Sequence, residues 1–322
     1  MNQLQSQSHR RGFTLVELLV AIGIILVLIG ILLPALGKVA TKAKMTDTTA
    51  RMNEFAKACD AFYTQFNYYP GIVPEAMLAA TVNPPISGTE NALLHLMGGA
   101  IRNDDPTYAA SAGTELTFGT AGTTGTGQVK IKINAIDIGK GPRIEGKQYE
   151  PFFTPKDAQL KIAVGQVGQT SALPDLLDAW GQPIGYIRSS RPTGLMTGTV
   201  ADNPQFFIEP LLPYFNSTGL GDLAIDQTAN SVFYAGTTLN KQEYLAQLIR
   251  HPAMGSFAVL GDAKAGTPRG KYFLFSAGSD GIYFANLGDG PTPTLTFTFT
   301  GTDARKPDVV TTYNDIVVSG GG

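Results

Sequence analysis

The chain has 322 residues, with 24 lysines and arginines against 26 aspartates and glutamates, and a formal net charge of -2. This balance argues against a nucleic-acid-binding protein, which needs a clustered excess of basic residues to contact phosphates. A single cysteine excludes an intrachain disulfide, and three histidines leave little room for histidine-based metal or triad chemistry.

The first predicted element is an apolar helix near the N-terminus. Residues 18–37 contain no charged side chain. A helix rises about 1.5 Å per residue, so this stretch is long enough to cross a hydrocarbon core of about 30 Å. A secretory signal sequence has a shorter apolar core, of about 7–15 residues, followed by a small-residue cleavage site. Pro34 and Lys38 do not resemble such a site, and we therefore predict a retained anchor over residues 13–37.

Glu17 is unusual because it introduces a carboxylate at the edge of this apolar segment. An unpaired charge near the membrane centre costs on the order of 2.5–3.5 kcal/mol, and less near the interface. A cut just before Phe13 would create an α-amino group four residues before Glu17. Residues four apart share a helix face, so the amine could pair with its own Glu17 or with that of a neighbouring subunit.

The segment Arg10–Glu17, with the sequence RRGFTLVE, resembles the processing signature of type IV pilins and type II secretion pseudopilins. The resemblance implies that a prepilin peptidase cuts after Gly12, that Phe13 is then methylated, and that Glu17 takes part in assembly. It also implies that the leader, residues 1–12, is cytoplasmic and that the body lies outside. The alternative, a coincidental signal anchor, leaves Glu17 unexplained.

The helix is predicted to continue as an amphipathic segment over residues 38–70. Its apolar side chains step by three and four and form one stripe: Met52, Phe55, Cys59, Phe62 and Phe66. A single helix from residue 13 to residue 66 would be about 80 Å long, more than a globular body of this size can cover. We therefore expect its first half to be covered by a bilayer or by the same segment of neighbouring subunits.

The body, residues 71–322, is predicted to contain a C-terminal sheet. Residues 178–187 resemble the Asp-x-Trp-Gly-x-Pro block of type II secretion major pseudopilins, where the block leads into this sheet. The resemblance implies an α+β, pilin-like fold, in which the second half of the long helix packs on a C-terminal antiparallel β-sheet. Trp180 is expected to pack the sheet on the helix. The middle of the body, about residues 100–175 and 190–250, has no counterpart in the resemblance and is predicted to be an enlargement.

Two further blocks near the C-terminus are similar to the same subfamily. Residues 276–281 match Ser-x-Gly-x-Asp-Gly, and residues 314–317 match its acidic-isoleucine ending. In many members the loop between these blocks binds calcium, a cation that prefers several oxygen ligands. The resemblance implies four candidate ligands in this chain: Asp280, the Leu287 carbonyl, Asp289 and Asp315.

The calcium prediction has an alternative. The chain departs from the pattern by a long insertion, residues 291–312, whose Thr/Leu/Phe alternation is typical of a strand. Aspartates that precede glycine also serve as ordinary turn formers. Calcium binding and a purely structural turn therefore both remain open.

The resemblance implies a structural filament subunit of a type II secretion pseudopilus or a type IV pilus-like filament, not an enzyme. Expected partners are copies of itself or other pseudopilins, prepilin peptidase, the inner-membrane assembly platform and membrane lipid. The protein is expected to span the inner membrane once, with its body in the periplasm or outside the cell, and to enter a filament on assembly. After loss of residues 1–12 the chain keeps 22 basic and 26 acidic side chains, so no nucleic-acid partner is expected.

Two alternatives come from other functional classes. One is a membrane-anchored extracytoplasmic binding module that recognises a glycan or a secreted substrate, which exposed aromatic side chains near 214–215 or 283–284 would support. The other is an anchored hydrolase. Against it, the sequence has no Gly-x-Ser-x-Gly motif, zinc-ligand spacing or phosphate-binding loop, and only His95 and His251 follow the cleavage site.

Overall fold

A computed structural model describes most of the helix and sheet framework of the chain. The described residues are 14–81, 85–119, 128–163, 173–199, 201–207, 245–246, 248–252, 266–284 and 315–321. The chain divides into two units, Met1–Lys44 and Met45–Gly322.

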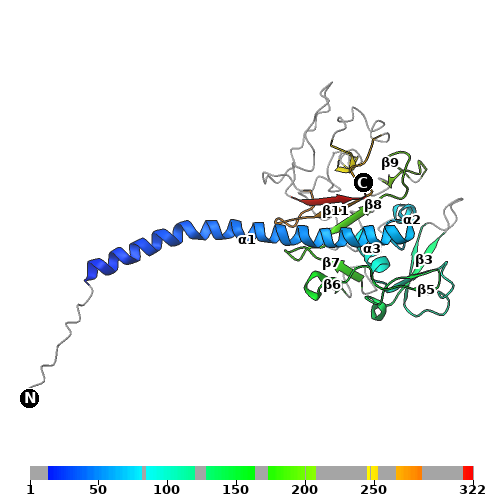
Figure 1. Cartoon of the computed structure of the whole chain (residues 1–322), viewed down its shortest axis with the longest axis horizontal. Helices are drawn as coiled ribbons and strands as arrows, with labels where there is room; N and C mark the ends of the chain where they lie inside the picture. The colour runs from blue at the N-terminus through cyan, green and yellow to red at the C-terminus, as the bar shows by residue number, and fades with distance from the viewer. Residues whose placement is uncertain are drawn as a thin grey trace, which may run out of the picture. The chain divides into compact units, whose positions relative to one another are not determined.

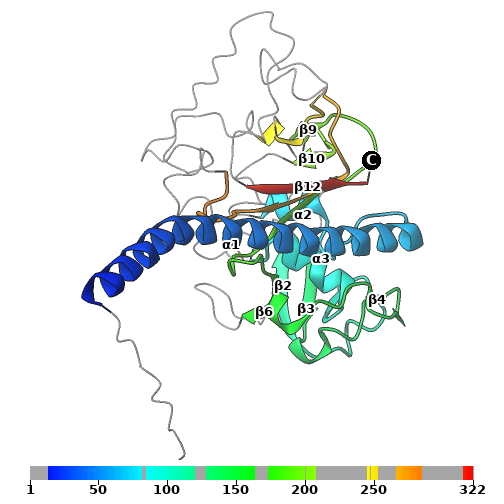
Figure 2. The same ribbon diagram turned by 60° about the vertical axis from the view of Figure 1, so that its left-hand side comes forward.

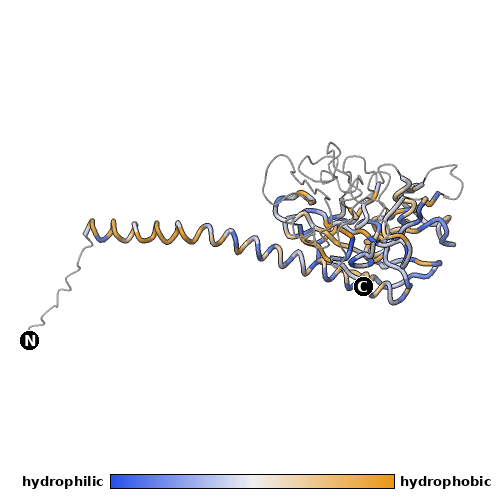
Figure 3. Tube along the Cα trace, turned by 90° about the horizontal axis from the view of Figure 1, so that it is seen from above, coloured by the Kyte–Doolittle hydropathy of each residue, from blue (hydrophilic) through white to orange (hydrophobic). Residues whose placement is uncertain are grey.

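Helix α1, Leu15–Phe66, is 52 residues long and runs through both units (Figure 1). Its first part is apolar, as the colouring of Figure 3 shows, and its large side chains are exposed. Pro34 lies inside the helix and lacks the N–H that would bond to the carbonyl of residue 30. The helix is continuous in spite of this proline, and the long helix predicted from the sequence is confirmed.

The second unit contains the predicted C-terminal antiparallel sheet, with strand order β12-β11-β8. These strands are β8 (Gly185–Arg188), β11 (Tyr272–Ser276) and β12 (Ile316–Gly320). Gly185 faces Phe275 across the ladder, and a Cβ at residue 185 would lie 2.1 Å from the Phe275 ring. The α+β, pilin-like architecture expected from the sequence is confirmed.

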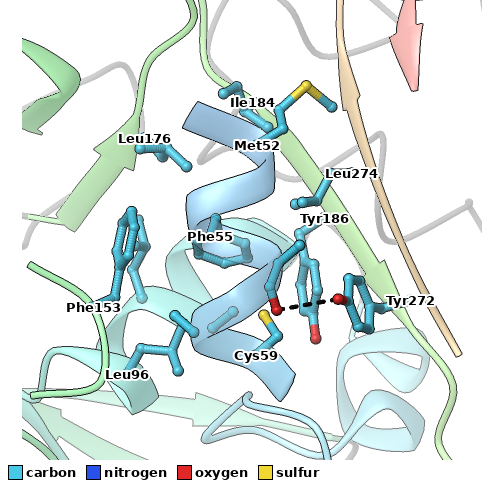
Figure 4. Close-up of a cluster of buried hydrophobic side chains, with 14 of the residues drawn as sticks. Met52, Phe55, Cys59, Leu96, Phe153, Leu176, Ile184, Tyr186, Tyr272 and Leu274 are labelled. Atoms are coloured by element: carbon cyan, nitrogen blue, oxygen red, sulfur yellow. Dashed lines mark hydrogen bonds between the residues drawn. The ribbon is translucent and has the colours of Figure 1, made fainter. Parts of the chain in front are cut away.

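The second half of α1 packs against this sheet through the predicted apolar stripe. Met52, Phe55, Cys59 and Phe62 are fully buried. The Phe55 ring meets Phe153 and Tyr186 edge-on, with centroids 5.3 and 5.5 Å away (Figure 4).

A hydrogen bond and the single tryptophan add to this contact between helix and sheet. The Tyr272 hydroxyl on β11 donates to the Ala56 carbonyl of α1 at 3.1 Å (Figure 4). Trp180 is half-buried and packs against the same hydrophobic cluster, as expected from the sequence.

The turn that contains Trp180 ties the helix to the sheet. Asp178 Oδ1 accepts from the backbone N–H groups of Trp180 and Gln182, at 2.8 and 2.9 Å, and Oδ2 accepts from Ser276 Oγ at 2.7 Å. Arg51 of α1 donates to the Asp178 carbonyl at 3.0 Å. One carboxylate therefore joins the two sequence blocks, 178–187 and 276–281, that resemble the pseudopilins.

The remaining elements complete the body on both sides of α1. In Figures 1 and 2 the second half of α1 lies between the C-terminal sheet and the β6-β7 pair. Helix α3 begins with a capping box between Ser87 and Glu90. A second sheet has the order β1-β3-β2. The elements are α2 (Glu75–Ala80), α3 (Gly88–Leu96), β1 (Ala100–Arg102), β2 (Thr114–Phe118), β3 (Val129–Ile133), β4 (Arg143–Ile144), β5 (Lys147–Gln148), β6 (Leu160–Ala163), β7 (Leu173–Leu176), β9 (Thr197–Gly198) and β10 (Phe206–Phe207), with 3-10 turns at Ala135–Asp137 and Asp157–Gln159.

Two carboxyl groups are buried where α3 packs on β7. Asp175 is 2 % exposed and Glu90 is fully buried. Burial, with the negative charge of Glu90 as a second cause, raises the pKa of Asp175 to about 8. The folded state therefore holds a proton on Asp175 at pH values where the unfolded chain has released it.

We predict that ionisation of Asp175 lowers the free energy of unfolding as the pH rises. Its stabilising contribution is complete below the unfolded pKa of 3.8 and is lost as the pH rises through about 8, because the native pKa is raised. An Asp175→Asn variant cannot ionise there and should be more stable than the wild type at pH 8–9, on the order of a few kcal/mol, with little difference near pH 4. Urea unfolding of the full-length protein in detergent at both pH values measures this. The exposed Asp157→Asn variant is the control, and equal pH profiles for Asp175→Asn and wild type would contradict the prediction.

Candidate functional site

The start of α1 is held by a capping box between Thr14 and Glu17. The Glu17 N–H donates to Thr14 Oγ1 at 3.2 Å, and Glu17 Oε2 accepts from both the N–H and the Oγ1 of Thr14 at 2.9 Å. The first N–H groups of a helix have no partner within the helix, and this reciprocal pair satisfies two of them. The carboxylate of Glu17 is thereby fixed at the helix start, within four residues of the predicted cleavage point.

This geometry leaves Glu17 Oε1 available for a hydrogen bond or ion pair with another group. Oε2 takes both hydrogen bonds from Thr14, while Oε1 accepts none from the described residues. Both capping residues follow the predicted cut, so their hydrogen bonds do not depend on the leader. Gly12 and Phe13 lie outside the described residues, and their roles in processing stay predictions.

The apolar face that follows Glu17 is the second part of the site. By length and composition, α1 can cross a membrane: its most apolar 18-residue window has a mean hydropathy of 3.1, and none of that window is buried. Leu15 is 77 % and Ile31 is 70 % exposed. Exposed apolar surface of this extent is unfavourable in water, so it indicates contact with lipid or with another protein. These features indicate a membrane-anchored protein.

The structure describes two of the four candidate calcium ligands, and both accept hydrogen bonds from backbone N–H groups of the same turn. Asp280 Oδ1 accepts from the Ile282 N–H at 3.1 Å, and both oxygens of Asp315 lie 2.9 Å from the Phe284 N–H. Burial, with the nearby Asp280 charge adding to it, raises the pKa of Asp315 well above its usual range.

The other two candidates, Leu287 and Asp289, lie outside the described residues. Within the described part of the chain, no three histidine, cysteine, aspartate or glutamate side chains gather as a metal site. The structure therefore brings Asp280 and Asp315 to one turn and leaves the complete ligand set a prediction.

The histidine and the cysteine in the core have structural roles. His95 is buried, and its Nδ1 accepts from the Gly71 N–H at 3.1 Å. Burial, together with the positive charge of Arg188, lowers the pKa of His95 to about 3, so the ring is neutral. Burial raises the pKa of the Cys59 thiol well above its usual range, which disfavours the reactive thiolate.

The aromatic pair at 283–284 is buried. Tyr283 and Phe284 are each 2 % exposed. Their burial removes the support that exposed rings at this position would have given to a glycan-binding surface. The other pair, Tyr214 and Phe215, lies outside the described residues.

The sequence analysis missed the capping role of Thr14 and the role of Arg188. The spacing Thr-x-x-Glu just before an apolar run is a recognised helix-start signal and could have identified the cap. Arg188 is buried and bonds to backbone carbonyls of residues 69–73, contacts that bridge more than 100 residues of chain. No local pattern indicates such a role.

Comparison with known proteins identifies the N-terminal segment. The family described as the prokaryotic N-terminal methylation motif matches residues 7–33. This range contains the predicted cleavage site, Phe13, the capping box and most of the exposed apolar helix. No curated protein and no solved structure matches the chain.

We predict that the Thr14→Ala substitution makes the first turn of α1 open more often. Loss of a threonine cap costs about 1 kcal/mol, so the Glu17 amide, which Thr14 Oγ1 protects, should exchange with solvent about fivefold faster. Thr14→Ser keeps the hydroxyl and should exchange at the wild-type rate. Hydrogen exchange followed by NMR on the full-length protein in micelles measures this, with Thr41→Ala on the same helix as the control. Unchanged exchange at Glu17 in Thr14→Ala would show that the capping box does not hold the helix start.

Proposed function

We propose that this chain, which carries the N-terminal methylation motif that is the signature of type IV pilins and pseudopilins, is a structural subunit of a pilus-like filament. The observation that carries the proposal is the motif at the head of a long helix whose first part is apolar and exposed. The subunit is processed after Gly12, methylated at Phe13 and assembled through its N-terminal helix. It has no catalytic role of its own.

Two features of the N-terminal segment account for assembly: its apolar surface and its charged groups. Lipid tails are as apolar as leucine, so the helix gains little hydrophobic free energy by leaving the bilayer for a neighbouring helix. A charge pair between the Phe13 amine of one subunit and Glu17 of another supplies attraction and sets their register. Once outside the membrane, the apolar segments bury one another, because each exposed square ångström of apolar surface costs about 25 cal/mol in water.

We further propose that the filament is a type II secretion pseudopilus. The blocks at 178–187 and 276–281 support this assignment, and the Asp178–Ser276 hydrogen bond gives them a shared structural purpose. The proposed partners are other pseudopilins or copies of this chain, prepilin peptidase, the inner-membrane assembly platform and membrane lipid. The body lies in the periplasm or outside the cell.

Processing and assembly are tested by two substitutions. Gly12→Leu should leave the leader attached, because it removes the glycine after which the proposed cut falls. Glu17→Gln should be cut and methylated as in the wild type but should fail to form filaments, because the amine loses its charged partner. Intact mass and N-terminal sequencing of the protein from native membranes measure the first effect, and recovery of sheared filaments measures the second.

The matched control for assembly is Glu54→Gln, an exposed glutamate of the same helix, which should assemble normally. A native chain that begins at Met1 would overturn the filament proposal. Normal filaments from Glu17→Gln would overturn the assigned role of this carboxylate alone.

We also propose that Asp280, Asp289, Asp315 and the Leu287 carbonyl bind calcium. The support is that Asp280 and Asp315 hold the same Ile282–Phe284 turn. A ligand that binds only the folded state raises its stability. Calcium should therefore raise the Tm of the full-length protein in detergent, and Asp280→Asn should reduce the rise. No rise with calcium would show that these aspartates only form turns, and the same rise with magnesium would show a divalent-cation site that is not specific for calcium.

A further inference from the structure

A cleft of about 840 Å³ lies in the body at the C-terminal end of α1. Its walls come from the loop after α1, the turn after β1, the β4-β5 turn and the segment after β8. This volume is in the range of small-ligand sites, about 300–1,000 Å³. Glu17, Asp280 and Asp315 do not line it, so the proposed filament function does not account for it.

One wall of the cleft is aromatic. The rings of Tyr63 and Tyr69 are stacked, with centroids 4.6 Å apart and planes 20° from parallel, and Tyr68 also lines the wall. Tyr63 is 38 % and Tyr68 is 41 % exposed. Tyrosine combines a flat apolar face with a polar tip, and it is suited to ligands that carry both kinds of group.

The floor of the cleft is fixed by a buried arginine. Arg188 donates to the carbonyls of Tyr69, Gly71 and Val73 and forms an ion pair with Glu75 at 2.8 Å. A Cβ at residue 71 would lie 2.5 Å from the guanidinium carbon, so the loop approaches this closely because it has glycine there. A site held in place in this way loses little freedom when it binds a ligand.

The charged groups that line the cleft are only partly balanced. Five basic and four acidic side chains line it. Arg102 pairs with Asp104, and Arg188 pairs with Glu75. The Asp105 carboxylate is turned toward the protein, where it accepts from backbone N–H groups of two neighbouring turns.

Arg191, which follows β8, and Lys271, which directly precedes β11, are two basic groups that line the cleft. Arg191 donates to the Asn203 carbonyl at 3.1 Å, and Lys271 donates to the Pro192 carbonyl at 2.5 Å. The hydrogen bonds of both side chains within the described body end on neutral oxygens. Arg143, which bonds to a glutamine oxygen, and the exposed carboxylate of Glu145 also line the cleft. An anion at Arg191 and Lys271 would compensate their charge.

We propose that this cleft binds an acidic oligosaccharide, with a sugar ring on the exposed tyrosine faces and a ring carboxylate paired with Arg191 and Lys271. A pyranose ring presents C–H groups that pack on an aromatic face and hydroxyl groups that bond to polar lining atoms. Its carboxylate forms charge-assisted hydrogen bonds with arginine and lysine. A nucleic acid would bring a phosphate at every nucleotide against Asp104 and Glu145, and an acidic peptide lacks the flat ring face.

The test uses the full-length protein in detergent and trigalacturonate as the probe, with binding measured by calorimetry. Saturable binding that weakens as salt is added is expected, because the paired charges are partly exposed. Maltotriose, triglutamate and a short single-stranded DNA should bind more weakly. No saturable binding of trigalacturonate would overturn the proposal, and tighter binding of any comparison ligand would overturn the assigned class.

Variants then locate the site. Arg191→Gln and Lys271→Gln should each weaken binding about tenfold, which corresponds to about 1.4 kcal/mol. Tyr63→Ala should also weaken it, whereas Tyr63→Phe keeps the ring and should bind as the wild type does. Wild-type affinity in Arg191→Gln and Lys271→Gln would overturn the proposal.

Two controls separate this proposal from others. Lys140→Gln removes a lysine that pairs with Asp137 outside the cleft and should not change the affinity. Glu17→Gln should bind the probe normally, because the cleft does not involve the N-terminal segment. A thermal unfolding midpoint equal to that of the wild type shows that each variant is folded.

Discussion

Helix α1 has to satisfy two environments along one continuous backbone, and the rest of the molecule is arranged around this constraint. The first part exposes large apolar side chains on all its faces, whereas the second part buries only one stripe. A helix that is apolar all round needs surroundings as apolar as itself, while an amphipathic helix needs a partner on one side only. The first part therefore depends on lipid or on another protein, and the second part depends on its own body.

The body supplies that partner through contacts that are specific as well as apolar. Phe55 contacts Phe153 and Tyr186 in this cluster, and two hydrogen bonds add directional contacts to the packing. The Tyr272 hydroxyl on the Ala56 carbonyl, and Arg51 on the carbonyl of Asp178, fix the helix lengthwise against the sheet. Asp178 also accepts a hydrogen bond from Ser276. The turn that contains Asp178 therefore connects helix α1, the segment that leads into β8 and the end of β11.

The sequence predicted what depends on short-range periodicity. The apolar run and the stripe on α1 follow from spacings within a few residues. The resemblance at 178–187 also located the turn that precedes β8. What it missed depends on distant contacts: Arg188 bonds a loop more than 100 residues earlier, and the cleft combines side chains from segments that lie far apart in the chain. The buried pair Asp175 and Glu90 was missed for the same reason, since the two residues lie on β7 and α3 and come together only in the folded body.

The order of strands in the C-terminal sheet has a consequence for synthesis. β11, the central strand, begins at Tyr272, and β12, which pairs with it, begins at Ile316. The stripe on α1 is made more than 100 residues before β8 and more than 200 residues before β11 and β12, and such separations slow folding because long loops must close first. Until β12 has left the ribosome, the sheet against which Phe55 packs through Tyr186 is incomplete. A nascent or truncated chain therefore exposes the apolar stripe of α1, which favours chaperone binding and proteolysis.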